Sequence, residues 1–367
     1  MKKLIQERIE KAISDKVFPG AVLGVIFQTG KRLILPFGHF TYEEGASLMR
    51  EDSVFDIASI TKSIPTSSLA LRLICGGKIN LEDPVIQYIP ELKFLHCETV
   101  QVKHLLTQTL SFGFRLSDYK DKTADEILDI IFKTDHSYKP GTKYSYSNAT
   151  SILLGLVVER VCGDRLEPLA QKFFFEPLGM DRTTFYPERF KKNNIVPTEL
   201  DPWRQRVIQG EVHDESAYRL SQKQPVGSAG LFSTAADLLR FMEMLLNDGC
   251  INRIRFLSRE ILDLAQENQI PGLDAQAGLG WEIDAAKFMG KFAGQKTFGK
   301  TGFTGCSVVI NRMIGVGFAL LTNYTYPRRR RNHDLMNNIR RDLADIIFDD
   351  LASKRGVGIS WNGFINS

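Results

Sequence analysis

Strand signals lie near both ends of this chain, and that placement restricts the folds open to it. Residues 21–27 and 33–37 are apolar runs on either side of Gln28-Thr29-Gly30-Lys31, which is a hairpin signal. Residues 307–310 and 316–322 are two more such runs near the other end. Strands at both ends with helices between them predict one antiparallel sheet that both ends complete, covered by helices on its faces. The predicted fold class is therefore α+β.

Helical spacing of apolar residues predicts helices at 3–16, 333–352 and 234–247. The apolar faces that mark the two terminal helices consist of Ile5, Ile9 and Ile13, and of Leu335, Ile339, Leu343 and Ile346. With 367 residues, of which 43% are hydrophobic, the chain exceeds the usual single compact domain. We predict a sheet lobe from 1–58 together with 291–367, and a mainly helical lobe from 59–290. The functional site should lie at their junction.

A hydroxyl and an amine stand three residues apart at Ser59-Ile60-Thr61-Lys62, where an apolar stretch enters a predicted helix. Residues at i and i+3 share a helix face, so Lys62 can reach the Ser59 hydroxyl and compete for its proton. This pattern alone is common. Pro65 lacks a backbone donor and predicts a local bend early in the helix.

Two later segments supply groups that acyl transfer on a serine requires. Tyr146-Ser147-Asn148 follows a Pro-Gly turn signal, and Lys300-Thr301-Gly302 precedes a β-branched run. The order Ser-x-x-Lys, Tyr-x-Asn, Lys-Thr-Gly, with about 85 and about 150 residues between the motifs, is that of the penicillin-recognising serine hydrolases.

The chain resembles the branch of that superfamily that contains class C β-lactamases, D-Ala-D-Ala carboxypeptidases and esterases. Beyond the three motifs, the resemblance rests on FPGAVLGV at 18–25, VKHLLTQT at 102–109, GEVHDESA at 210–217, GSAGLFSTAADLLRF at 227–241, GLGW at 278–281 and KTGFTG at 300–305. It implies a β-lactamase/transpeptidase-like fold. One departure is visible: such proteins often carry a histidine and a Ser-Gly pair after LLT, where this chain has Gln108, Thr109 and Leu110.

The resemblance also implies roles for the site residues. Ser59 would be the nucleophile, and its proton would pass to Lys62 or Tyr146, a choice that the sequence leaves open. A free lysine has a pKa of about 10.4, so Lys62 needs burial or a neighbouring positive charge such as Lys300 to be neutral at pH 7. The expected substrate-binding residues are Asn148, Lys300, Thr301, Gly302 and Phe303. The backbone N–H groups of Ser59 and Phe303 would bind the oxyanion.

Other ligand classes have weaker support. Residues 294–301 match the phosphate-loop pattern G-x-x-x-x-G-K-[ST], but without the strand before it and the helix after it that this loop requires. His213-Asp214-Glu215 suggests a metal or a triad, yet no second ligand pair follows, so we expect a loop near the pocket. We therefore expect no metal and no cofactor. A net charge of +4, from 47 basic and 43 acidic residues, does not favour nucleic acid.

The expected setting is the cytoplasm. The five cysteines form no C-x-x-C pair, the N-terminal segment is an amphipathic helix and lacks the apolar core of an export signal, and no run is long enough for a membrane span.

The leading hypothesis is a serine hydrolase that forms an acyl-enzyme on Ser59 with small esters or amides. The alternatives are a D-Ala-D-Ala carboxypeptidase or β-lactamase, and a non-catalytic binding or scaffolding protein that keeps the fold. The oligomeric state remains open.

Overall fold

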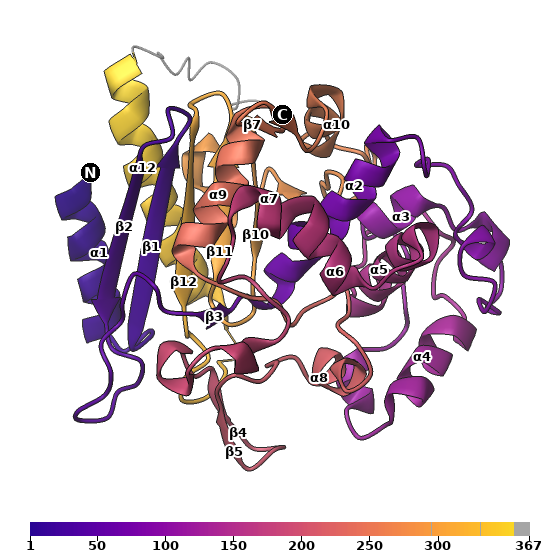
Figure 1. The fold of residues 1–367 in the computed structure, drawn as a ribbon, viewed down its shortest axis with the longest axis horizontal. Coiled ribbons are helices and arrows are strands. Elements are labelled where there is room, and N and C mark those ends of the chain that lie inside the picture. Colours follow the sequence, from indigo (N-terminus) through magenta and orange to yellow (C-terminus); the bar gives the residue numbers. More distant parts are fainter. Residues whose placement is uncertain (295, 331, 356–367) are drawn as a thin grey trace.

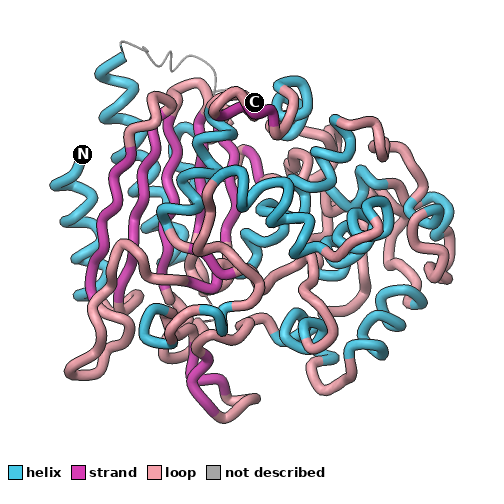
Figure 2. The backbone as a smooth tube through the Cα atoms, viewed as in Figure 1, coloured by secondary structure: helices cyan, strands magenta, loops and turns pink. Residues whose placement is uncertain are grey.

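The structure, a computed structural model, describes residues 1–294, 296–330 and 332–355. Figures 1 and 2 show a sheet flanked by helices at one side of the molecule and a helix-rich region at the other. The α-helices are α1 (Lys2–Ser14), α2 (Ser68–Cys75), α3 (Val102–Leu106), α4 (Ala124–Lys133), α5 (Asn148–Cys162), α6 (Leu166–Ala170), α7 (Glu176–Leu178), α8 (Glu215–Ser221), α9 (Ala235–Leu246), α10 (Arg259–Ala265), α11 (Ala286–Met289) and α12 (Asp334–Arg355).

The main sheet has six antiparallel strands in the order β2-β1-β12-β11-β10-β9, so both chain ends meet in its centre. The pairing of β1 with β12 sets Ala21 opposite Thr322 and Phe27 opposite Val316. These strands are β1 (Gly20–Phe27), β2 (Arg32–Gly38), β9 (Glu282–Ile283), β10 (Thr297–Thr301), β11 (Ser307–Asn311) and β12 (Val316–Thr322). The α+β sheet completed by both ends is thus confirmed. Three small ladders pair β3 (Phe55–Asp56) with β6 (Phe232–Ser233), β4 (Glu199–Asp201) with β5 (Arg206–Ile208), and β7 (Cys250–Ile251) with β8 (Ile254–Arg255).

Both faces of the sheet are covered, which explains why its central strands are apolar throughout. Alternate residues of β1 face opposite sides: Leu23 and Val25 belong to the core under α1 and α12, whereas Val22 and Ile26 belong to the larger core under α9. Figure 1 shows α1 and α12 beside each other and α9 on the other side of the strands. Two elements of the predicted helical lobe, 59–290, belong to this part of the molecule: β9 is a strand of the sheet, and α9 packs against it. The division into two lobes at these boundaries stays a prediction.

The predicted terminal helices and α9 are present, with small differences. Thr234 caps α9, since its hydroxyl accepts the backbone N–H of Asp237. In α12 the predicted apolar face was partly wrong: Leu335 is exposed, and the buried face is formed by Met336, Ile339, Leu343 and Ile347. Helical spacing fits both faces, and the position of the sheet decides between them.

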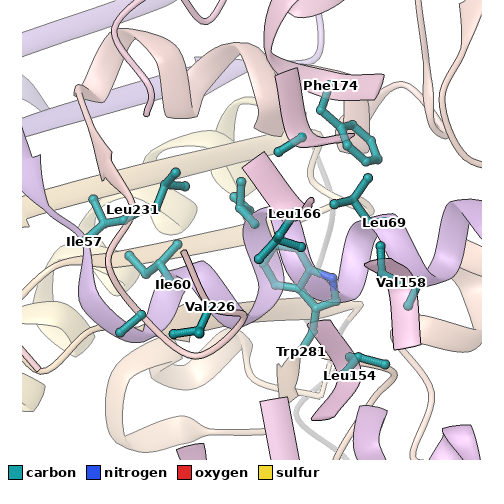
Figure 3. Close-up of a cluster of buried hydrophobic side chains, with 14 of the residues drawn as sticks. Ile57, Ile60, Leu69, Leu154, Val158, Leu166, Phe174, Val226, Leu231 and Trp281 are labelled. Atoms are coloured by element: carbon teal, nitrogen blue, oxygen red, sulfur yellow. The ribbon is translucent and has the colours of Figure 1, made fainter. Parts of the chain in front are cut away.

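The helix-rich region packs around the segment that carries Ser59. Figure 3 shows Ile57 and Ile60, on either side of Ser59, pointing into the hydrophobic core near Leu231 and Val226. The backbone N–H of Ile57 also donates to the carbonyl of Leu231 at 3.1 Å. Burial of these two side chains therefore anchors the Ser59 turn in the core. Within the described part of the chain, no helix is long and apolar enough to cross a membrane.

Candidate active site

Ser59 lies in a short 3-10 helix, Ala58–Lys62, directly after β3. Ala58 has φ of +48°, a left-handed conformation that strains a residue with a side chain. The buried carboxylate of Asp56 stabilises this turn, because its two oxygens accept the backbone N–H groups of Ala58 and His213, each at 2.8 Å. The sequence predicted that a helix with a bend near Pro65 begins at Ser59; in the structure helical geometry is interrupted at Ile64, and α2 begins at Ser68. This interruption agrees with the bend expected from Pro65.

The amine of Lys62 is buried next to the Ser59 hydroxyl. In a 3-10 helix residues i and i+3 lie above one another, which places Lys62 Nζ 3.0 Å from Ser59 Oγ. Two amine N–H groups donate to acceptors that cannot donate in return, the Ser228 carbonyl at 2.7 Å and Asn148 Oδ1 at 2.8 Å. The third position around the nitrogen faces Ser59, so a neutral amine would direct its lone pair at the hydroxyl proton. Burial lowers the pKa of Lys62, and the charge of Lys300 acts in the same direction.

Asn148 is held by an acidic residue from a distant segment. It is the first residue of α5, which is capped by the Ser147 hydroxyl. Its Nδ2 donates to Asp214 Oδ2 at 2.8 Å and to the Ser216 hydroxyl at 3.3 Å. Asp214 is itself the N-cap of α8. This arrangement fixes the amide so that its oxygen faces Lys62.

Tyr146 lies between the two lysines. Lys62 Nζ is 5.1 Å and Lys300 Nζ 4.7 Å from the centre of its ring. The residue is 45% exposed overall, but these groups surround its phenol. Burial of the phenol is the largest single influence on its pKa and raises it, yet both lysine charges and a hydrogen bond with Ser59 outweigh burial and bring the pKa of Tyr146 below its usual value.

Lys300 is buried in β10 and forms an ion pair with Glu282 of β9, with Nζ 3.0 Å from Oε1. Burial alone would lower the pKa of Lys300, but Glu282 and Tyr146 raise it above its usual value. Lys300 therefore stays charged, and Glu282 compensates part of that charge.

The end of β10 abuts the Ser59 turn. A Cβ atom on Gly302 would lie 2.5 Å from the carbonyl oxygen of Ile57, so only glycine allows this approach. From α12, the buried guanidinium of Arg340 donates to the carbonyls of Gly302 and Cys306, at 3.2 and 3.0 Å. Residues 297–301 form a strand, and β11 follows them after a turn, so the phosphate-loop pattern lacks the helix that it requires.

Phe303 follows this glycine, and Thr301 is the last residue of β10. In the part of the chain that the structure describes, the Phe303 backbone N–H donates to no protein acceptor. The Phe303 side chain is 38% exposed and stacks on the ring of His213 at 5.6 Å, with Arg329 5.7 Å away. Glu199 accepts from both of these residues. This phenyl group therefore forms a supported apolar wall beside the Lys-Thr-Gly motif.

The side chains of His213, Asp214 and Glu215 do not point toward a common site. His213 pairs with Glu199, Asp214 with Asn148, and Glu215 with Arg329. Among residues 1–294, 296–330 and 332–355, no group of three His, Cys, Asp or Glu side chains is arranged to hold a metal ion.

The structure thus brings Ser59, Lys62, Tyr146, Asn148 and Lys300 together, as the motifs predict. Sequence reasoning missed the supporting carboxylates Asp56, Asp214 and Glu282. For Asp214 the sequence predicted only a loop near the pocket, whereas the structure begins α8 at Glu215 and makes Asp214 its N-cap, a position at which aspartate is favoured. No local signal identifies Glu282, since its partner comes from another strand.

A sequence profile of the family described as Beta-lactamase matches residues 2–340. The chain is 30% identical over 357 residues to an N-acetylmuramyl-L-alanine amidase of Bacillus subtilis (strain 168), an alignment that covers 87% of this chain and 80% of the relative. The range that the profile matches includes all three motifs.

Solved structures share the fold. EstCE1, a hydrolase with promiscuous acyltransferase activity, aligns with a TM-score of 0.73 and 20% identity over 94% of this chain and 98% of that one. A β-lactamase/D-alanine carboxypeptidase from Pseudomonas syringae aligns with a TM-score of 0.72 and 20% identity over 93% and 98%. The profile match over most of the chain, together with the assembled Ser-x-x-Lys, Tyr-x-Asn and Lys-Thr-Gly motifs, shows that this protein belongs to the beta-lactamase family.

Proposed function

We propose that this protein is a serine hydrolase that forms a covalent acyl-enzyme on Ser59 and hydrolyses small esters or amides. The observation that carries this proposal is the 3.0 Å contact between Lys62 Nζ and Ser59 Oγ, with the other amine N–H groups already bound to Asn148 and Ser228. A buried amine with a lowered pKa, aimed at a hydroxyl, is the arrangement that activates a serine nucleophile.

In the proposed reaction, Ser59 Oγ bonds to the substrate carbonyl carbon while its proton passes to Lys62 or to the Tyr146 phenolate. The backbone N–H groups of Ser59 and Phe303 stabilise the oxyanion. Collapse breaks the bond to the leaving alcohol or amine, which takes up the proton. Water then attacks the acyl-enzyme, and the same base accepts the water proton and returns it to Ser59. Because Lys62 and Tyr146 interact, the proton belongs to the pair of groups.

The experiment compares the wild type with Ser59→Ala by intact mass and turnover, using p-nitrophenyl acetate, a penicillin and a D-Ala-D-Ala peptide. We expect turnover of the short ester that disappears in Ser59→Ala. Equal rates in the two proteins would exclude Ser59 as the nucleophile, and no reaction with any of the three compounds would favour a binding or scaffolding role.

A peptidase or amidase activity is the second candidate. The similarity to an amidase of Bacillus subtilis and the charged Lys300, which could meet a substrate carboxylate, favour it. Faster acylation by the D-Ala-D-Ala peptide than by the neutral ester would select this alternative.

We also propose that the protein acts in the cytoplasm. All five cysteines are free thiols, as in reducing compartments. Fractionation of the producing cells, with thiol labelling of each fraction, would test this.

A further inference from the structure

Gln108, two residues beyond α3, holds the backbone on both sides of Tyr146. Its main-chain carbonyl accepts the N–H of Ser145 at 2.8 Å, and its side-chain Oε1 accepts the N–H of Ser147 at 2.9 Å. One residue thus binds both neighbours of the tyrosine.

The conformation of Gln108 is itself constrained. Its φ is +57°, in the left-handed region that a residue with a side chain seldom adopts, and such strain is kept where surrounding contacts enforce it. Its Nε2 donates to the Ser151 hydroxyl at 3.1 Å, one turn into α5. The amide therefore joins the Tyr146 loop to the helix that also carries Asn148.

Gln108 lies close to the reacting groups. It lines a small cavity together with Lys62, Tyr144 and Lys300. A glutamine carries no charge there, whereas a histidine has an ordinary pKa of about 6.5. The link that Gln108 provides is thus independent of pH over the range in which the site would operate.

We propose that Gln108 is a positioning residue, which holds the Tyr146 phenol between the amino groups of Lys62 and Lys300. This inference rests on the proposed function. The charged or titratable groups that act on Tyr146 include Lys62, Lys300, Glu282 and Tyr144. Loosening the loop would move the phenol away from the two lysines, so its pKa should return toward its ordinary value.

Three variants test this proposal. Gln108→Leu removes both side-chain hydrogen bonds, and Gln108→Glu keeps an acceptor for the Ser147 N–H but adds a charge. Gln101→Leu makes the same change at the other end of α3, where the amide binds the backbone of Glu82 and His104 and makes no contact with the Tyr146 loop. The measurements are kcat, KM and the pH profile with p-nitrophenyl acetate, and the ionisation of Tyr146 by ultraviolet difference titration against Tyr146→Phe.

We expect Gln108→Leu to lower kcat by up to about 100-fold, with a smaller change in KM, because a displaced catalytic group costs rate more than binding. Its Tyr146 should ionise at higher pH. Gln108→Glu should keep more of the rate but also raise the pH at which Tyr146 ionises, since its carboxylate opposes the phenolate. Gln101→Leu should leave kcat and the pH at which Tyr146 ionises unchanged.

Unchanged kcat and unchanged Tyr146 ionisation in Gln108→Leu would overturn the proposal. Equal rate losses in Gln108→Leu and Gln108→Glu, with the wild-type titration in both, would also overturn it, because they would show a purely structural role. If Gln108→Leu does not fold, Gln108→Asn, whose shorter amide cannot span the same distance, replaces it. Absence of Ser59-dependent turnover in the wild type would refute the proposed function alone, since the titration does not depend on activity.

Discussion

The Asp214 carboxylate accepts a 2.8 Å hydrogen bond from Asn148 Nδ2 and thereby turns the Asn148 oxygen toward Lys62. In Asp214→Asn an NH2 group would replace the oxygen that accepts from Asn148 Nδ2, so two donors would face each other. Asn148 could then flip and turn its own NH2 group toward the Lys62 amine. We expect kcat/KM to fall by about 100-fold through misplacement of the base. Steady-state kinetics would measure this. Asp118→Asn, a change in the exposed segment after Phe114, is the matched control, and an Asp214→Asn enzyme as active as this control would contradict the assigned role.

The second prediction concerns Asp56, which binds two backbone N–H groups below the Ser59 turn. An asparagine has one oxygen and can satisfy only one of these donors, so Asp56→Asn leaves a buried N–H group unpaired. We expect the free energy of unfolding to fall by about 1–3 kcal/mol, together with a loss of kcat. Urea denaturation measures the first quantity. Asp52→Asn, on the nearby surface, should change stability little; equal stability of the two variants would show that Asp56 does not support the turn.

The third prediction concerns the contact between Gly302 and Ile57. In Gly302→Ala the new methyl group would overlap the Ile57 carbonyl oxygen and push the end of β10 away from Ser59. We expect a loss of about 1–3 kcal/mol in stability and a lower kcat. Gly76→Ala is the control, because its nearest neighbour would be 3.6 Å from the added Cβ. Wild-type thermal stability and kcat in Gly302→Ala would rule out the close approach.

The fourth prediction is a pH dependence. Lys62 and Tyr146 both have pKa values lowered in the folded protein, and either must lose its proton to act as the base. Activity should therefore rise with pH and level off below the ordinary lysine value of about 10.4. Asp214 raises the pKa of Lys62, so the residual activity of Asp214→Asn should rise at lower pH than that of the wild type.

A pH profile of kcat/KM for the wild type and Asp214→Asn measures both effects. A rise centred at the ordinary lysine pKa would show that neither group is activated by the fold. A shift of the Asp214→Asn profile to higher pH would contradict the assigned electrostatic role of Asp214.

Local sequence patterns determined four strands of the main sheet, the two terminal helices, α9 and the identity of the central site residues. Apolar runs such as residues 21–27 and 316–322 are strand-forming in themselves, and their burial on both faces agrees with the lack of polar alternation. The spacing of Ser59 and Lys62 already placed the amine beside the hydroxyl, because i and i+3 meet in any tight helix.

The tertiary structure alone decided which partners support these residues. Asp214, Glu282 and Gln108 reach the site from other segments, and contacts between distant segments depend on how helices and strands pack, which local spacing does not encode. The same cause explains α12, where periodicity allowed a face with Leu335, but the sheet buries the neighbouring face with Met336. It also explains the short 3-10 helix at Ser59, because Asp56 and the buried side chains of Ile57 and Ile60 hold the strained turn in place.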